Sequence, residues 1–316
     1  QKNRGFSDMS IKSLKVPTID FINKRKYALI FSALLLVMSV VSLGLQGLKL
    51  GIDFTGGTLI EVGYEQTADL EGIRTKLADA DYIGTNVQYF GSDTEVLIQL
   101  EPQEVSSAKL SSSIIRMLGE DVDVRRVEFV GPKVGEELTN DGGLALLYAL
   151  IGILIYVALR FEYRFALGSI SALVHDVVIT LGVFSLFQIE FDLTVLAALL
   201  AVIGYSLNDT IVVFDRIREN FLSTRHTDPK PIVNDALNQT LARTLTTSLT
   251  TLLVLLALYF LGGEVIHSFA GALIIGVVIG TYSSIYVASS MILALGIAKE
   301  DMLPSEKEKK EIDARP

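Results

Sequence analysis

The chain has 316 residues, of which half are hydrophobic, and its formal net charge at pH 7 is −9. The hydrophobic residues are concentrated in long blocks, which excludes an ordinary soluble globular protein. The acidic balance gives no indication of nucleic-acid binding. The absence of cysteine excludes disulfide bonds, thiolate chemistry and metal sites with thiolate ligands. The three histidines are too scattered to predict a metal site of their own. No cofactor is expected.

Six apolar blocks of about 18 to 31 residues predict six transmembrane helices, because a helix needs about 20 residues to cross a bilayer. Four blocks contain no charged residue, the third contains Asp176 and the fourth contains Asp209. The blocks are 27–48, 142–159, 166–187, 193–214, 244–263 and 268–298. The fold class predicted is therefore an α-helical membrane protein with an additional segment, 49–141, outside the bilayer.

Basic residues predict the orientation of these helices, because cytoplasmic segments carry an excess of Lys and Arg. Most of the 27 Lys and Arg residues lie in segments 1–26 and 299–316 and in two of the connections. Both termini and the connection 215–239 are therefore expected in the cytoplasm, with residues 49–141 on the opposite side. The first block starts too late and is too long for the core of a signal peptide.

Residues 49–141 have the pattern of a small α+β domain with the order β-α-β-β-α-β, which is that of a ferredoxin-like fold. Strands are expected where apolar residues alternate, and helices where they recur every three or four positions. The expected strands are 57–64, 86–90, 95–100 and 122–130, and the expected helices are 68–80 and 106–118. No catalytic constellation occurs here, so we interpret the segment as a docking or substrate-contact domain and expect no enzymatic activity.

The first block is joined to this domain by the sequence Gly51-Ile52-Asp53-Phe54-Thr55-Gly56-Gly57. Glycine permits backbone conformations that other residues resist, which favours a turn that fixes the domain on the membrane. A nucleotide site is the alternative, but the sequence lacks the Gly-Lys-Ser/Thr ending of a phosphate-binding loop.

Asp209 is indicated as a functional acid, because the block around it is otherwise apolar. An ionisable group at membrane depth costs roughly 3 kcal/mol on insertion scales, so such a group usually serves a function. The alternative is an acid near a helix end that reaches the lipid headgroups, although aspartate is too short to reach far. Asp176, beside His175 in the third block, is a second acid that could bond a neighbouring helix or extend a proton path.

Arg243 directly precedes the fifth block, in a helix expected to begin before it, at a depth similar to that of Asp209. Apolar surroundings favour a protonated carboxyl and a nearby guanidinium favours an ionised one, so the two residues could form a proton-coupled switch. The alternative for Arg243 is a positively charged anchor at a helix start. In the sixth block, Gly276 and Gly280 form a GxxxG pattern, which permits close approach of another helix.

Two long motifs in this chain resemble those of the SecD/SecF family of protein-export membrane proteins. The first is the segment 51–57, followed by an outer α+β domain and five helices, and the second is the block 204–220 together with 241–248. Besides Asp209, the residues that carry the match are Gly51, Asp53, Phe54, Gly56, Gly57, Asn208 and Thr210. The resemblance covers nearly the whole chain, roughly 27–298.

The resemblance implies a protein of the bacterial inner membrane that acts with SecD beside the SecYEG translocon. Its substrates would be preproteins, and YidC is a further candidate partner. In the family, the pair assists late protein export with the proton-motive force, and an Asp and an Arg matching Asp209 and Arg243 are associated with proton use. The family's working unit contains twelve helices, so this chain would supply one half.

Two other functions stay open at this point. The six-helix unit is related to resistance-nodulation-division (RND) transporters, so one alternative is a proton-driven exporter of lipids or small molecules. RND exporters usually have two much larger outer loops for every twelve helices. The other alternative is a scaffold without energy coupling, which would gain nothing from costly charges in the membrane.

Overall fold

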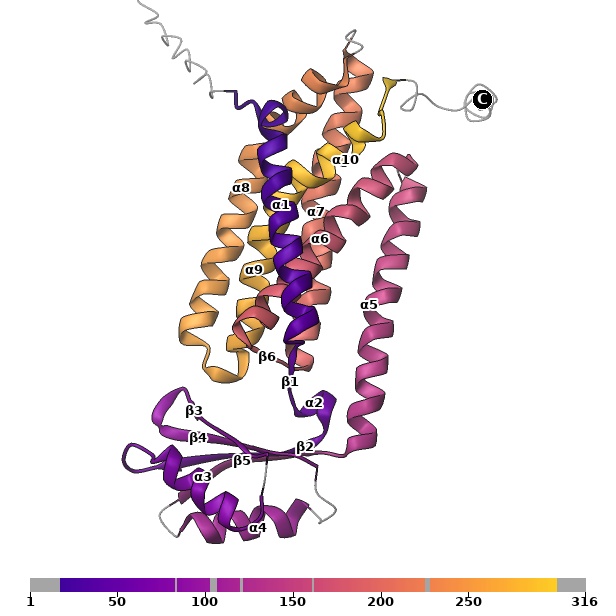
Figure 1. Ribbon diagram of the computed structural model, residues 1–316. Coiled ribbons are helices and arrows are strands. Elements are labelled where there is room, and N and C mark those ends of the chain that lie inside the picture. The colour runs from indigo at the N-terminus through magenta and orange to yellow at the C-terminus, as the bar shows by residue number, and fades with distance from the viewer. Residues whose placement is uncertain are drawn as a thin grey trace, which may run out of the picture.

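The structure is a computed structural model that describes residues 18–82, 84–102, 107–119, 122–160, 162–224 and 228–299. The expected terminal segments 1–26 and 299–316 lie largely outside these described residues. A bundle of long helices carries a small α+β domain (residues 57–130) at one end, as Figure 1 shows.

Six helical spans in the described residues are long and apolar enough to cross a membrane, which confirms the predicted number. The first five are α1 (Phe21–Leu45), α5 (Pro132–Arg160), α6 (Tyr163–Phe187), α7 (Leu193–Ser223) and α8 (Pro229–Leu261). The sixth comprises η1 (Glu264–Ile266), α9 (His267–Ser283), the π-helical turn η2 (Ser284–Ala288) and α10 (Ser289–Ala294).

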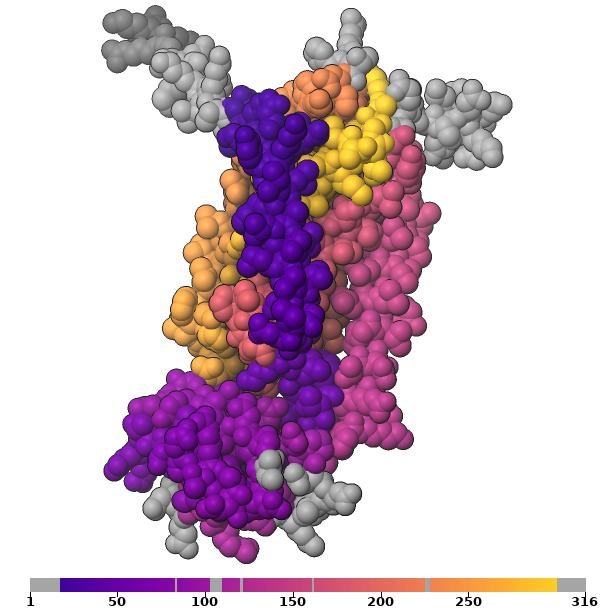
Figure 2. All heavy atoms as spheres, viewed as in Figure 1, coloured from indigo at the N-terminus to yellow at the C-terminus, as the bar shows by residue number. Residues whose placement is uncertain are grey.

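The helices α6 and α7 form the centre of the bundle. In the most apolar window of each helix, 56% of α6 and 44% of α7 is buried, against 17% of α1 and α8 and 11% of α5. Figure 2 shows α1, in indigo, lying at the surface along the length of the bundle. Polar side chains on α6 and α7 are therefore the ones that the fold encloses.

Three of the helices extend beyond the segments expected to cross the membrane. The helix α5 begins at Pro132, inside the segment assigned to the outer domain, because proline suits the first turn of a helix, where its missing N–H would stay unpaired anyway. The helices α7 and α8 continue through most of the predicted loop 215–239. Apolar residues at helical spacing, including Ile217 and Phe221 on α7, are buried in this extension.

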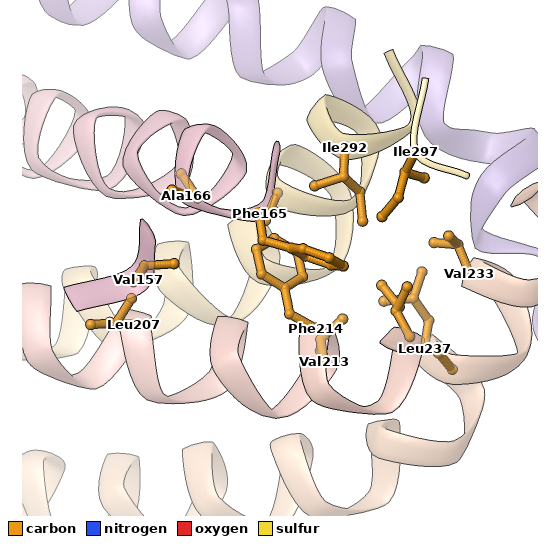
Figure 3. Packing of buried hydrophobic residues seen from close by; sticks show 14 of the residues in the cluster. Val157, Phe165, Ala166, Leu207, Val213, Phe214, Val233, Leu237, Ile292 and Ile297 are labelled. Atoms are coloured by element: carbon orange, nitrogen blue, oxygen red, sulfur yellow. The ribbon is translucent and has the colours of Figure 1, made fainter. Parts of the chain in front are cut away.

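A hydrophobic cluster holds the extended ends together, far from the α+β domain. The rings of Phe165 on α6 and Phe214 on α7 meet edge to face, with centroids 4.8 Å apart. Figure 3 shows side chains of other elements around them, among them Val233 and Leu237 of α8 and Ile292 of α10. This packing fixes the position of α7 relative to its neighbours.

The α+β domain contains one four-stranded antiparallel sheet with the strand order β3-β4-β2-β5. Its elements are β2 (Gly57–Tyr64), α3 (Leu70–Asp79), β3 (Asn86–Phe90), β4 (Ser92–Leu100), α4 (Ser107–Leu118) and β5 (Val122–Val130). They follow the order expected from the sequence. The helices α3 and α4 cover the sheet face turned away from the bundle, so the other face is turned toward the membrane helices (Figure 1).

A second, two-stranded sheet that the sequence analysis did not predict joins the two parts of the molecule. The strand β1 (Lys49–Leu50) follows α1 and pairs in parallel with β6 (Glu190–Phe191), which precedes α7. The short helix α2 (Ile52–Thr55) follows β1 directly. The chain that enters the α+β domain is therefore bonded to the chain that enters α7.

Candidate functional site

Asp176 lies at the centre of the bundle on α6 and is completely buried, with 0% of its surface exposed. Its Oδ2 atom accepts hydrogen bonds from the hydroxyls of Ser206 on α7, at 2.6 Å, and Ser283 on α9, at 2.8 Å. Its Oδ1 atom lies 2.9 Å from Nδ1 of His175. Asp176 thus bonds two neighbouring helices, as one interpretation of its sequence position expects, and its place on a proton path stays a prediction.

The hydrogen bonds continue from His175 to α1 and back to α9. Nε2 of His175 lies 3.1 Å from Oγ of Ser32, which in turn lies 3.1 Å from the hydroxyl oxygen of Tyr282. The Tyr282 hydroxyl donates to the carbonyl oxygen of Ala28 at 2.6 Å. We call His175, Asp176, Ser32, Ser206, Tyr282 and Ser283 the α6 network. The sequence analysis singled out Asp176 but not its partners on three other helices, because no local pattern marks them.

The GxxxG glycines position part of this network. A Cβ atom on Gly276 would lie 2.1 Å from a methyl carbon of Val202, and one on Gly280 would lie 3.0 Å from Cβ of Ser206. The close approach expected of this pattern is therefore confirmed, and it occurs between α9 and α7. It brings Ser206 within hydrogen-bonding distance of Asp176.

Asp209 is also buried, with 3% of its surface exposed, but its surroundings differ. Its Oδ2 atom has no hydrogen-bond partner among the described residues, and the same is true of the hydroxyls of Thr210 beside it and Thr244 on α8. Burying a polar group without a partner is unfavourable. The α7–α8 pair therefore contains polar groups whose hydrogen-bonding capacity is unused among the residues that the structure describes.

Arg243 lies on the exposed side of α8. Within the described part of the chain it forms no ion pair with Asp209, although its charge is near enough to act on that carboxyl through space. Asn208, next to Asp209 in the sequence, is likewise exposed on α7. The structure thus places Asp209 inside the bundle and the polar side chains of Asn208 and Arg243 on its membrane-spanning surface.

The hydroxyls along α8 make two kinds of hydrogen bond, one within the helix and one to a neighbouring helix. Those of Thr246, Thr247 and Thr250 bond carbonyl oxygens of their own helix. Ser248 instead bonds Thr281 of α9 across a 2.6 Å contact. In the described structure, these threonines satisfy their own backbone.

The segment 51–57 is bonded to the beginning of α7. The backbone N–H of Gly51 donates to the carbonyl of Phe191 at 2.9 Å, and Oδ2 of Asp53 accepts from the backbone N–H of Leu193 at 3.0 Å. The rings of Phe54 and Phe191 lie 5.7 Å apart. Leu193 is the first residue of α7, where a negative charge also complements the helix dipole. Asp53 is therefore a second cap for the helix that carries Asp209.

Two glycines of this segment form the turn that the sequence predicts. Gly56 and Gly57 have φ angles of +71° and +133°, which side chains rarely adopt. A Cβ atom on Gly56 would lie 2.9 Å from Cα of Pro132 at the start of α5, and one on Gly57 would lie 2.3 Å from a backbone oxygen of Leu100. The turn thus packs the α+β domain directly against α5.

A cavity of about 490 Å³ lies between the open face of the sheet and the ends of the membrane helices. Its polar lining includes Lys49, Asp53, Gln88, Arg126, Glu190 and Asp192. Burial raises the pKa of Glu190, and the carboxylates of Asp192 and Asp53 raise it further, whereas Lys49 opposes the shift. The sequence analysis missed Glu190, because its burial depends on the pairing of β1 with β6. Within the described residues, no group of three or more His, Cys, Asp or Glu could hold a metal ion.

Two family models and proteins from several bacteria match the sequence of this chain. Residues 110–298 match the family model described as protein export membrane protein SecD/SecF, C-terminal, and residues 41–68 match the SecD/SecF GG motif. The protein translocase subunit SecF of Vibrio alginolyticus is 54% identical over 95% of this chain and 97% of its own length. The Escherichia coli O157:H7 protein of the same name is 47% identical over 93% of each chain.

Two solved structures share the fold. The crystal structure of SecDF from Thermus thermophilus, described as a translocon-associated membrane protein, matches 89% of this chain with a TM-score of 0.82 and 40% identity. SecDF in its super-membrane-facing form matches 95% of this chain with a TM-score of 0.67 and 37% identity. This chain spans 39% and 40% of those two chains. The chain belongs to the SecD/SecF family of protein export membrane proteins.

Proposed function

We propose that this chain is the SecF-type subunit of a bacterial protein translocase, which uses the proton-motive force with SecD to assist late preprotein translocation through SecYEG. The observation that carries the proposal is the match to protein translocase subunit SecF of Vibrio alginolyticus, 54% identical over nearly the full length of both chains. The family's GG motif, at residues 41–68, supports the same role.

Asp209 is the proton-binding group in this proposal and Arg243 is the charge that responds to it. A buried carboxyl whose Oδ2 atom lacks a hydrogen-bond partner can lose or gain a proton without breaking an internal bond at that atom. Gain of the proton removes the attraction between the carboxylate and the guanidinium, which leaves Arg243 free to take another partner. Asp176 extends the proton path on the neighbouring helix.

The partner of the membrane bundle is SecD. Asn208 and Arg243 are exposed on helices that would otherwise face lipid, where polar and charged groups are costly. This chain also spans only about two fifths of the SecDF chains that it resembles. A second half packed against α7 and α8 would cover these side chains, and contact with YidC would involve other surfaces.

The remaining assignments concern sidedness. The α+β domain, with a ferredoxin-like arrangement of strands, lies on the periplasmic side of the inner membrane and contacts preproteins, while both termini are cytoplasmic. Single cysteines in place of Ser92 and Ser223, both exposed, would test this in a chain that has no cysteine. An impermeant thiol reagent should label them from opposite sides, and labelling from one side would disprove the assignment.

The export experiment compares Asp209→Asn with a matched control, Asp215→Asn. Asp215 lies on the same helix, but its side chain is 49% exposed and lies 3.8 Å from Arg160. In cells that depend on the variant subunit, export is measured with the proton gradient present and after its collapse. Asp209→Asn should lose the gradient-dependent part of export while the complex still assembles, and Asp215→Asn should retain it.

Arg243→Lys completes the series, because it keeps the positive charge but loses the planar fork of the guanidinium. We expect partial activity from this variant. Wild-type gradient dependence in Asp209→Asn would show that this carboxyl is not the coupling group.

A further inference from the structure

The hydrogen bonds of the α6 network can be assigned a direction, starting from Tyr282. The carbonyl oxygen of Ala28 can only accept, so the Tyr282 hydroxyl donates its single hydrogen to it across 2.6 Å. The oxygen of Tyr282 can then only accept in its 3.1 Å contact with Ser32. Ser32 is therefore the donor to Tyr282.

The direction of this bond determines the state of His175. Because the hydrogen of Ser32 is used, Oγ of Ser32 must accept from Nε2 of His175 in the 3.1 Å contact between them. Nε2 therefore carries a hydrogen. The 2.9 Å contact between Nδ1 of His175 and Oδ1 of Asp176 then needs a proton of its own, since two bare acceptors would repel each other.

We propose that His175 and Asp176 together bind one proton, and that they form a second intramembrane proton-binding site besides Asp209. The proton lies either on Nδ1 as an imidazolium facing a carboxylate, or on Oδ1 as a carboxylic acid facing a neutral imidazole. In both forms the pair is neutral overall, and every contact of the α6 network is a hydrogen bond. Its part in energy coupling rests on the proposed function, whereas the proton binding itself does not.

The surroundings of the pair favour the bound proton. His175 and Asp176 are 3% and 0% exposed, and Ser206 and Ser283 both donate to Oδ2 of Asp176. Without the proton, the pair would carry a full negative charge inside the bundle, which is unfavourable. The ring of Tyr282 stacks on that of His175 with centroids 6.2 Å apart, an arrangement that suits a cationic imidazole.

In the part of the chain that the structure describes, no hydrogen bond or ion pair brings another charged group to the pair to compensate for that charge. The ring of Tyr282 stacks on that of His175, and Tyr286 of η2 follows with its ring 5.3 Å from that of Tyr282. Asp209 lies on α7 about one turn from Ser206. Among the described residues, no hydrogen bond or ion pair joins the pair to a charged group of α1, α5, α7 or α10.

Release of the proton would change a contact between helices. The imidazole keeps one hydrogen, which now lies on Nδ1 and bonds the Asp176 carboxylate, so Nε2 becomes an acceptor. Ser32 must turn its hydrogen from Tyr282 to Nε2. One proton leaves, the charge of the pair falls from zero to −1, and the hydrogen bond between Ser32 on α1 and Tyr282 on α9 is lost. Proton occupancy is thereby linked to the contact between α1 and α9.

The test is NMR of the full chain in lipid nanodiscs, recorded across a pH series, with nitrogen signals from labelled histidine and carboxyl-carbon signals from labelled aspartate. His175 is assigned by the loss of its signals in His175→Gln. At neutral pH we expect either two protonated ring nitrogens on His175 or a protonated Asp176 carboxyl, and one proton fewer in Asp176→Asn. A neutral His175 facing an ionised Asp176 throughout the series would overturn the proposal.

Variants of Ser32 and Tyr282 test the direction of the bonds. Tyr282→Phe frees the Ser32 hydroxyl to donate to Nε2, and Ser32→Ala leaves the Nε2 hydrogen without an acceptor. Either change should weaken proton binding about tenfold, the equivalent of one lost hydrogen bond. The matched control is Ser42→Ala, which removes another buried bond between α1 and α6, the 2.9 Å contact with Ser185. Equal effects of Ser42→Ala and Ser32→Ala would contradict the assigned direction.

These readouts separate the inference from the proposed function. The NMR signals of His175 report proton occupancy without any export assay. Loss of the proton site would leave the Asp209 proposal intact, and gradient-dependent export in Asp209→Asn would leave the His175–Asp176 site intact.

Discussion

Two buried acids on adjacent helices, Asp176 and Asp209, have opposite surroundings. Asp176 receives hydrogen bonds from α7 and α9 and faces a histidine, so both of its carboxyl oxygens are engaged. Asp209 has an Oδ2 atom without a partner among the described residues, and the nearby Arg243 is exposed instead of paired with it. Both oxygens of the Asp176 carboxyl make hydrogen bonds within the described residues, whereas the Asp209 carboxyl has an oxygen that makes none.

The difference shows that burial alone is a poor guide to the role of a charged residue. Both acids are almost fully buried, at 0% and 3% exposure. A carboxyl whose bonds are all made contributes to stability as well as to proton binding, because removing it leaves its partners unsatisfied. A carboxyl with a free oxygen contributes little to stability, so its presence is better explained by what it binds.

Measurements of the free energy of unfolding would test the difference between the two acids most directly. Asp176→Ala leaves the His175 ring and two serine hydroxyls without their partner, and we expect a loss of about 3–5 kcal/mol in the free energy of unfolding. Asp209→Ala removes a partly unsatisfied acid, so the isolated chain should lose little stability or gain some. Denaturant unfolding in detergent micelles measures both values, and equal losses would show that the two acids are not different in kind.

The next test concerns the geometry that completes the bonds of Asp176. In Gly276→Ala the new methyl group would lie 2.1 Å from a methyl carbon of Val202, which forces α9 away from α7. Overpacking of this kind costs about 1–3 kcal/mol. Gly204→Ala is the matched control, since a Cβ atom on that glycine of α7 meets nothing within 4 Å. Unfolding that is unchanged in both variants would mean that this helix contact does not hold Ser206 in place.

A third carboxyl, that of Asp53, accepts a hydrogen bond at the N-terminal end of α7 and so extends the comparison to an acid that caps a helix. Its loss in Asp53→Ala should cost about 1 kcal/mol, as for other capping side chains. The effect should be local, with hydrogen exchange of the Leu193 amide about five- to tenfold faster, because about 1.4 kcal/mol corresponds to a factor of ten. Asp53→Asn keeps an acceptor oxygen and should show a smaller change. Exchange that is unaffected in Asp53→Ala would remove this residue from the cap.

The smallest effect is expected from Glu190, a half-buried acid outside the membrane helices. Burial raises its pKa in the folded protein, so the folded state binds the proton more tightly than the unfolded state and ionisation of Glu190 is destabilising. Glu190→Gln should therefore stabilise the protein slightly at neutral pH. The gain should disappear as the pH falls through the raised pKa toward the ordinary glutamate value. A gain independent of pH would show that ionisation is not its cause.

Sequence patterns predicted the parts of the fold that depend on local periodicity. The six spans and the elements of the α+β domain follow from runs of apolar residues and from their alternation. The pairing of β1 with β6 could not be predicted, because each strand has two residues and they lie far apart in the chain. The start of α5 was missed because its first turns are polar and follow the domain without a break.

The candidate site was predictable only in part, for a similar reason. A lone acid in an apolar block identifies Asp209 and Asp176 whatever their partners are. The other members of the α6 network are serines, a tyrosine and an adjacent histidine, residue types that are common in membrane helices and carry no distinctive spacing. The sequence predicts Arg243 at a depth similar to that of Asp209, but which side of α8 it occupies depends on how that helix packs.

The π-helical turn η2 determines which side of the last helix faces the bundle. Along α9 the buried positions include Gly276, Gly280 and Ser283, whereas they include Ala288 at the end of the turn and Ile292 beyond it. A π turn accommodates one extra residue, and each residue rotates a helix by about 100°. Without it, the apolar stripe after Ser283 would drift off the core. Deleting one residue within 284–288 should therefore convert the turn to an ordinary α-helix and rotate Ile292 away from Phe165 and Phe214. The number of residues in this segment is thus constrained, as well as their identity.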